Sequence, residues 1–131
     1  MSRIHGDMLD RSFAFAVRIL GVVDSLPNGT KGWLVAKQLA RSGISIGANL
    51  HEADFAFSTI DFAHKCNVAL KEAAETQYWL RLSKAAQLLS GADLDQLIAE
   101  VEELKRILTT IVRKTQNPTD RSDASDSFTK R

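Results

Sequence analysis

The sequence predicts an all-α protein, an up-down-up-down antiparallel four-helix bundle. Proline occurs at only two positions, Pro27 and Pro118, so long helices can run uninterrupted between them. Apolar residues recur at spacings of three and four in four separate segments, and no segment alternates long enough to compete as a strand. The links between these segments are short and rich in turn residues, as expected between antiparallel neighbours in a bundle.

The first helical segment spans about residues 9–25 and is apolar on two neighbouring faces. One stripe follows a 4,3,4,3 spacing through Leu9, Phe13, Ala16, Leu20 and Val23. The other follows a 4,3,4 spacing through Phe15, Ile19, Val22 and Leu26. A helix that is apolar on two sides is expected to be buried on two sides. The turn residues Pro27, Asn28 and Gly29 end the segment.

The second segment, about 31–54, holds two glycines four residues apart, Gly43 and Gly47. Each glycine costs about 1 kcal/mol relative to alanine inside a helix, so we expect them to let another helix approach closely. One apolar stripe contains Leu39, Ile46 and Leu50, and a second contains Trp33, Ala40, Ile44 and Ala48. Between them runs a polar stripe of Gln38, Arg41, Ser45, Asn49 and Glu52.

The third segment, about 58–89, opens at Ser58 with Asp61 three residues later, an imperfect capping box. Its core face is dominated by small residues: Phe62, Cys66, Ala69, Ala73 and Leu80. A second, mixed face holds Val68, Glu72, Glu75 and Trp79. We expect Arg41 and the Asn49 amide of the second helix to pair with Glu72 or Glu75, which would set the register between the two helices.

The fourth segment, about 93–116, carries a strict heptad seam, which is typical of near-parallel helix packing. The seam consists of Leu94, Leu97, Val101, Leu104, Leu108, Ile111 and Thr115. Beyond it, residues 117–131 are mostly polar, and we expect a disordered C-terminal tail there. Residues 1–116 therefore form one predicted domain.

The second apolar faces indicate self-association. In a monomeric bundle each helix needs one apolar stripe, whereas the first three helices each have two. Leaving Phe15, Ile44 and Trp79 in water would create large exposed patches, which usually mark an interface. The alternative is that broad stripes wrap a thick core within one chain. We favour a homo-oligomer.

The composition argues against several other classes of protein. No histidine, cysteine or carboxylate spacing matches a metal motif, and no glycine-rich phosphate loop follows a strand. Glu72 and Glu75 could suggest half of a di-iron site, but the Glu-x-x-His motifs that such a bundle needs are missing. We expect no metal, no cofactor, no small-molecule substrate and no enzymatic activity. A single cysteine and the lack of a long apolar run predict a cytoplasmic protein without a membrane segment.

Nucleic-acid binding remains an alternative. The overall charge is nearly balanced, with 17 basic and 16 acidic residues, whereas nucleic-acid binders are usually strongly basic. However, assembly could gather the cations of the first three helices on one face. The candidate contacts with RNA or DNA are Arg11, Arg18, Lys31, Lys37, Lys65, Lys71 and Arg81.

Two blocks of sequence, residues 41–53 (RSGISIGANLHEA) and 69–80 (ALKEAAETQYWL), resemble a bacterial family of four-helix-bundle proteins related to those encoded in 23S rRNA intervening sequences. The resemblance implies a homopentameric ring of bundles and no established enzymatic activity. A related group, the accessory proteins of diversity-generating retroelements, contacts a reverse transcriptase and nucleic acid through a strongly basic bundle. The near-neutral charge of this chain departs from that group.

The family's motif positions fall here on the polar stripe and on the mixed face described above. They are Gln38, Arg41, Ser45, Asn49 and Glu52, with Lys71, Glu72, Glu75, Thr76 and Trp79. Together with Gly43 and Gly47, we expect them to build contacts between helices and between subunits. The predicted function is that of a non-enzymatic scaffold or adaptor that assembles with other copies of itself, in the pentamer that the resemblance implies. The alternative is an RNA- or DNA-binding oligomeric accessory protein.

Overall fold

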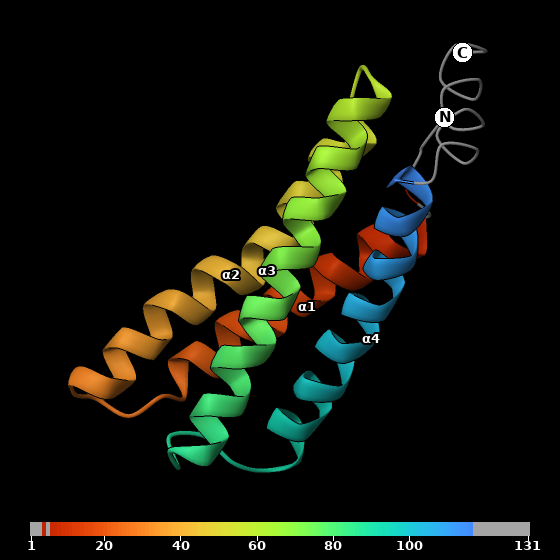
Figure 1. The fold of residues 1–131 in the computed structure, drawn as a ribbon. Coiled ribbons are helices and arrows are strands. Elements are labelled where there is room, and N and C mark those ends of the chain that lie inside the picture. The colour runs from red at the N-terminus through yellow and green to blue at the C-terminus, as the bar shows by residue number, and fades with distance from the viewer. Residues whose placement is uncertain (1–3, 5, 117–131) are drawn as a thin grey trace.

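The computed structural model describes Ile4 and residues 6–116, and it is a bundle of four antiparallel helices (Figure 1). The helices are α1 (Gly6–Asp24), α2 (Thr30–Asp54), α3 (Thr59–Ala85) and α4 (Ala92–Gln116). The predicted fold class is therefore confirmed. The tail predicted over 117–131 lies outside the described residues.

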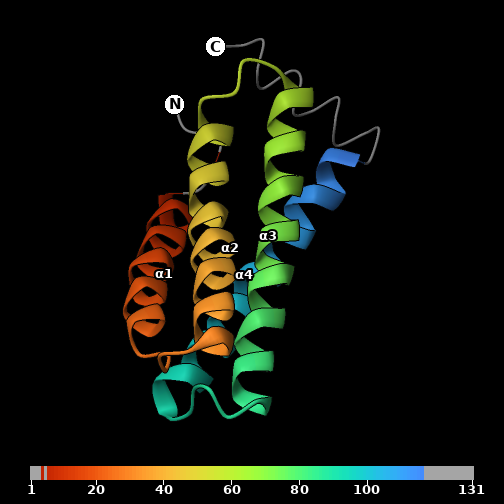
Figure 2. The same cartoon turned by 90° about the vertical axis from the view of Figure 1, so that its left-hand side faces the viewer.

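The four helices do not pack equally. α2 contacts both α1 and α3, α3 also packs along α4, and α1 and α4 meet only at a few points. Figure 2 shows α1 beside α2, with α4 lying behind the α2–α3 pair. The hairpin of α2 and α3 also extends beyond the start of α1, so that its turn projects from one end of the molecule (Figure 1). The bundle is thus a continuous row of helices, closed weakly between its first and last members.

One apolar core runs through the bundle. Its largest fully buried side chains include Phe15 and Ile19 from α1, Leu39, Ile46 and Leu50 from α2, Leu80 from α3, and Leu97, Leu104 and Leu108 from α4. The core face of α3 is built mainly from small residues, with Cys66, Ala69 and Ala73 fully buried. Small side chains on this central helix let α2 and α4 pack against it from two sides.

The orientation of α1 corrects one prediction. Phe15 and Ile19, which were assigned to a second face, are buried in the core, whereas Phe13 and Leu20 of the first stripe are exposed. The two stripes lie only about 100° apart on the helix, so their spacing alone does not choose between them. The choice depends on how α1 meets α2, since Ile19 occupies the space above Gly43.

The end of α3 corrects a second prediction. The helix ends at Ala85, four residues before the predicted limit of 89. Gln87 adopts a left-handed conformation with φ of 60°. The N–H of Leu88 donates to the carbonyl of Ser83 at 2.9 Å, and the N–H of Gln87 donates to that of Lys84 at 3.1 Å. These two bonds form a Schellman motif, which terminates the helix without a glycine.

The seam of α4 differs from the prediction at one position. Val112 is buried, while Ile111 is only partly buried. A straight helix has 3.6 residues per turn and drifts away from a strict seven-residue repeat, so the buried position moves by one residue at the C-terminal end of α4.

The predicted start of α3 is confirmed. Ser58 caps the helix, because the N–H of Asp61 donates to Ser58 Oγ at 3.0 Å.

Candidate interaction surfaces

A polar network joins α2 to α3 along their outer seam. Arg41 Nη1 donates to Glu72 Oε2 at 3.2 Å, and Arg41 Nη2 pairs with Glu75 Oε2. The indole Nε1–H of Trp79 donates to the same Glu75 oxygen at 3.0 Å. Gln38 Oε1 lies 3.4 Å from Arg41 Nε. Arg41, expected to pair with Glu72 or Glu75, pairs with both and so links α2 to α3 at one register.

The charges in this network shift in the directions that pairing predicts. The pKa of Glu75 is lowered, first by the hydrogen bond from Trp79 and then by the one from Arg41. The pKa of Arg41 is raised, chiefly by its hydrogen bond to Glu75. Arg41 and Glu75 remain partly open to water, which limits the contribution of their pairing to stability.

Two members of the predicted polar stripe do not join the network. Asn49 Nδ2 donates instead to the Ser45 carbonyl of its own helix at 2.8 Å, so its predicted pairing with Glu72 or Glu75 is wrong. Ser45 Oγ likewise donates to the Arg41 carbonyl at 2.6 Å. In both cases the side chain bonds to the backbone carbonyl one turn earlier in its own helix, which is closer to it than the glutamates of α3. Glu52 pairs across the hairpin with Lys65 Nζ at 2.8 Å.

The two glycines of α2 form the contact with α1. A Cβ atom at Gly43 would lie 2.9 Å from Ile19 Cγ1, and one at Gly47 would lie 3.2 Å from Ser12 Oγ. Both distances are shorter than ordinary van der Waals contact, so an alanine at either position would require Ile19 or Ser12 to shift. The close helix approach expected from these glycines is present, and it occurs within one chain.

A buried hydroxyl pair lies behind the polar network. Thr76 Oγ1 is 2.9 Å from Ser42 Oγ and 2.7 Å from the Glu72 carbonyl. Both side chains are fully buried. Ser42 and Thr76 thus link the α2–α3 interface beneath the exposed Arg41, and each satisfies the other's hydrogen-bonding needs.

An exposed apolar stripe runs along α1, which we name the α1 stripe. It consists of Phe13, Val17 and Leu20, whose exposed fractions are 64%, 56% and 54%. Ile44 of α2, next to the glycine that α1 crosses, is also exposed. The predicted excess of apolar surface on the first two helices is therefore real, although on α1 it belongs to Phe13 and Leu20 and not to Phe15.

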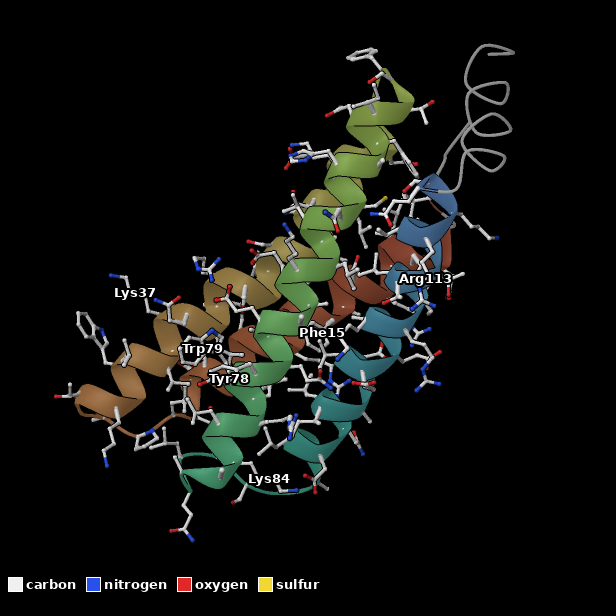
Figure 3. All side chains as sticks on the ribbon, in the orientation of Figure 1. Phe15, Lys37, Tyr78, Trp79, Lys84 and Arg113 are labelled. Atoms are coloured by element: carbon white, nitrogen blue, oxygen red, sulfur yellow. The ribbon has the colours of Figure 1, made fainter. Side chains whose placement is uncertain are left out.

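A second exposed apolar surface lies on the outer side of α3, which we name the α3 stripe. It consists of Ala74, Tyr78 and Leu82, at spacings of four. Tyr78 is 60% exposed and meets the half-buried ring of Trp79 edge to face, with the ring centroids 5.4 Å apart. Figure 3 shows the two aromatic side chains together on α3. Trp79, which the sequence placed on a second, mixed face of its helix, is thus hydrogen-bonded to Glu75 at the α2–α3 seam.

Other exposed apolar residues were missed by periodicity. Phe55, Phe57 and Ile60 surround the turn between α2 and α3, and Phe57 is 98% exposed. The only sequence signal was two phenylalanines inside a turn, where no helical repeat accounts for them. Trp33, by contrast, was predicted on the second apolar stripe of its helix. It is exposed near the start of α2, with Lys37 Nζ 5.7 Å from its ring centroid.

The structure distributes the predicted nucleic-acid contacts over several faces. Arg11 donates through Nε and Nη2 to both oxygens of Glu100 on α4, at 3.2 and 2.7 Å. Lys65 pairs with Glu52. The other candidates are exposed and make no ion pair with any described residue: Arg18, Lys31, Lys37, Lys71 and Arg81. Arg18 lies on α1, Lys31 and Lys37 lie on α2, and Lys71 and Arg81 lie on α3.

Three properties of the described part of the chain concern reactive groups, metal-binding groups and membrane spans. Burial raises the pKa of the Cys66 thiol to about 12, so it stays protonated near neutral pH and is a poor nucleophile. Within residues 6–116 and Ile4, no three or more His, Cys, Asp or Glu side chains converge as metal ligands would. None of the four helices is long and apolar enough to cross a membrane.

These features define a small all-α bundle protein with several exposed apolar surfaces and a polar network between its central helices. The family described as 23S rRNA-intervening sequence protein matches residues 6–110, and the chain belongs to this family. The chain is also similar to a crystal structure from Bacteroides thetaiotaomicron VPI-5482, described as a protein of unknown function from the S23 ribosomal protein family. The two share 40% identity and a TM-score of 0.74, over 80% of this chain and 97% of the other. No curated protein matches the chain.

Proposed function

We propose that this protein is a non-enzymatic, cytoplasmic scaffold or adaptor that works as a closed homo-oligomeric ring. The observation that carries the proposal is the α1 stripe. Phe13, Val17 and Leu20 are more than half exposed in the single chain. Contiguous large apolar side chains on a surface favour an interface, because burying them against another subunit removes them from water.

The number of subunits rests on the family. The sequence blocks at residues 41–53 and 69–80 resemble proteins that form pentameric rings, so we propose five subunits. A ring requires each copy to contact two neighbours through different surfaces. The α1 stripe and the α3 stripe supply two such surfaces, on helices that do not contact each other.

The first experiment is the solution mass by light scattering. We expect a mass of about five chains for the wild-type protein. Val17→Glu places a charge in the middle of the α1 stripe and should release monomers, because an unpaired carboxylate is costly to bury. Ala99→Glu is the matched control, since Ala99 is an exposed residue of α4 outside both stripes.

The outcomes separate clearly. A monomeric wild-type protein, or an unchanged ring in Val17→Glu, contradicts the scaffold proposal. Loss of the ring in Ala99→Glu as well would mean that any added charge disrupts assembly, and that the α1 stripe has no special role. Circular dichroism of both variants checks that the helices remain folded.

Binding of single-stranded nucleic acid is a second candidate, favoured by the arrangement around Trp33. An exposed aromatic ring with Lys37 one turn later combines a stacking surface with an unpaired cation. We would titrate labelled single-stranded RNA at low salt and follow fluorescence anisotropy. Binding that weakens steeply with salt and is lost in Trp33→Ala would place this function first. No binding at low salt would exclude it.

A further inference from the structure

We propose that the α1 stripe of one copy docks on the α3 stripe of the next copy, so that the subunits associate head to tail. This inference rests on the proposed ring and adds which surfaces meet. It follows from three properties of the two stripes: their apolar centres, the charges at their ends, and their positions on the bundle.

The α1 stripe is bounded by acidic residues. Asp10 precedes Phe13 by three residues and Asp24 follows Leu20 by four, so that both share the helical face of the stripe. Both aspartates are exposed, and neither makes an ion pair with another described residue. The surface is therefore apolar at its centre and negative at its two ends.

The α3 stripe has the opposite charges. Lys71 precedes Ala74 by three residues, and Arg81 lies beside Leu82 at the other end. Both cations are exposed and have no ion-pair partner among the described residues. This surface is apolar at its centre and positive at its ends.

The two stripes are also similar in length. With a rise of about 1.5 Å per residue, Asp10 and Asp24 are about 21 Å apart along α1, and Lys71 and Arg81 are about 15 Å apart along α3. The long side chains of lysine and arginine can cover the difference. An antiparallel or parallel approach would therefore place Tyr78 and Leu82 against the α1 stripe, with opposite charges at both ends.

The charges argue against a two-fold contact. If two α1 stripes met, the aspartates of one copy would face those of the other, and two α3 stripes would oppose their cations. Like charges across an interface disfavour such pairs. Because α2 separates α1 from α3, each copy can offer both stripes at once. A contact of unlike surfaces that repeats from copy to copy is the kind that a ring requires, and it closes when the rotation between neighbours divides a full turn.

The test is cross-linking between two single-cysteine additions, Leu20→Cys and Tyr78→Cys, with one variant carrying a cleavable size tag. The native Cys66 is buried and serves as an unreactive background in the wild-type control. The two variants are mixed, unfolded, refolded together and treated with a short bis-maleimide. We expect a covalent dimer of mixed size in the mixture and none in either variant alone.

The outcomes distinguish this inference from the proposed ring. A ring-sized mass with Leu20–Leu20 cross-links, or with no mixed cross-link, overturns the head-to-tail contact and leaves the ring intact. A monomeric mass overturns both. If the cysteine variants fail to fold, the charge variants described next give the answer.

Charge reversal provides an independent measurement. Asp10→Lys with Asp24→Lys should raise the dissociation constant of the assembly at least about 10-fold, because like charges then meet across the contact. Adding Lys71→Asp and Arg81→Asp to the same chain should restore it. Thr110→Lys on α4 is the control for an added positive charge. Absence of restoration in the fourfold variant contradicts the proposed pairing.

Discussion

Gly43 and Gly47 show how single residues set the position of a whole helix. With a Cβ atom at either position, α2 could not lie so close to α1, because that atom would meet Ile19 or Ser12. Glycine lowers the helix propensity of α2 at both positions. This cost is offset by the closer packing of α1 against α2, which is possible because glycine has no side chain.

Alanine at Gly43 should therefore destabilise the protein. The clash with Ile19 is expected to cost about 1–3 kcal/mol by overpacking, against about 1 kcal/mol gained in helix propensity. Gly21 is the control, because nothing lies within 4 Å of a Cβ placed there. Gly21→Ala should stabilise by about 0.5–1 kcal/mol. Urea unfolding of both variants measures whether the free energy of unfolding rises or falls. A stabilising Gly43→Ala would contradict the close packing of α1 against α2 at Gly43.

Glu75 carries a prediction about pH. Its pKa is lowered in the folded protein by Trp79 and Arg41, so the carboxylate stabilises the fold above its unfolded pKa of about 4.3. That contribution is lost as the pH falls through the lower folded value. Glu75→Gln should flatten the dependence of the unfolding free energy on pH below about 4.3.

The control for this prediction is Asp93→Asn, an exposed carboxylate on α4. Chemical denaturation at a series of acidic pH values follows both variants beside the wild type. An unchanged slope in Glu75→Gln would mean that the network does not hold the carboxylate in its charged form.

The length of a helix depends on how its ends are capped as well as on which face is buried. The C-terminus of α3 depends on Gln87 in the left-handed region, a conformation that glycine adopts more easily than glutamine does. The two backbone bonds from Gln87 and Leu88 satisfy carbonyls that the helix end leaves open.

Gln87→Gly should stabilise the protein by about 0.5–1 kcal/mol, because the left-handed residue no longer carries a Cβ. Ala85→Gly, two residues earlier in ordinary helical conformation, should destabilise it by a similar amount. Thermal and urea unfolding compare the pair. The prediction is wrong if the two substitutions shift stability in the same direction.

At the scale of the molecule, the bundle is weakest between α1 and α4. Apart from a few contacts and the Arg11–Glu100 ion pair, α1 is held to the chain by α2 alone. α3, in contrast, packs along both α2 and α4. α1, which packs closely against only one other helix, also carries the α1 stripe, so a second subunit bound there would stabilise a helix that one chain holds from one side.

Hydrogen exchange should report this difference. In the monomeric variant Val17→Glu, the amides of α1 should exchange at least about tenfold faster than those in the middle of α3, since local opening requires fewer contacts to break. In the wild-type ring the difference in exchange rate between α1 and α3 should be smaller. Equal protection of α1 and α3 in the monomer would contradict the open seam between α1 and α4.

The sequence by itself determined the class of the fold and most of its elements. Four segments with helical spacing, two prolines outside them and the leucine seam of α4 suffice, because these signals are local in the chain. Spacing also put Glu72 and Glu75 on one face of the third helix and Arg41 on a polar stripe of the second, which made their pairing an expectation.

Only the tertiary structure decided which stripe of α1 faces the core and which faces outward. The two stripes have nearly the same apolar content, so the choice depends on the space that Gly43 leaves for Ile19 and on the reach of Arg11 to Glu100. The partner of Asn49 and the end of α3 were missed for a different reason, since both depend on bonds to backbone carbonyls about one turn away in the same helix, which the spacing of apolar residues does not report.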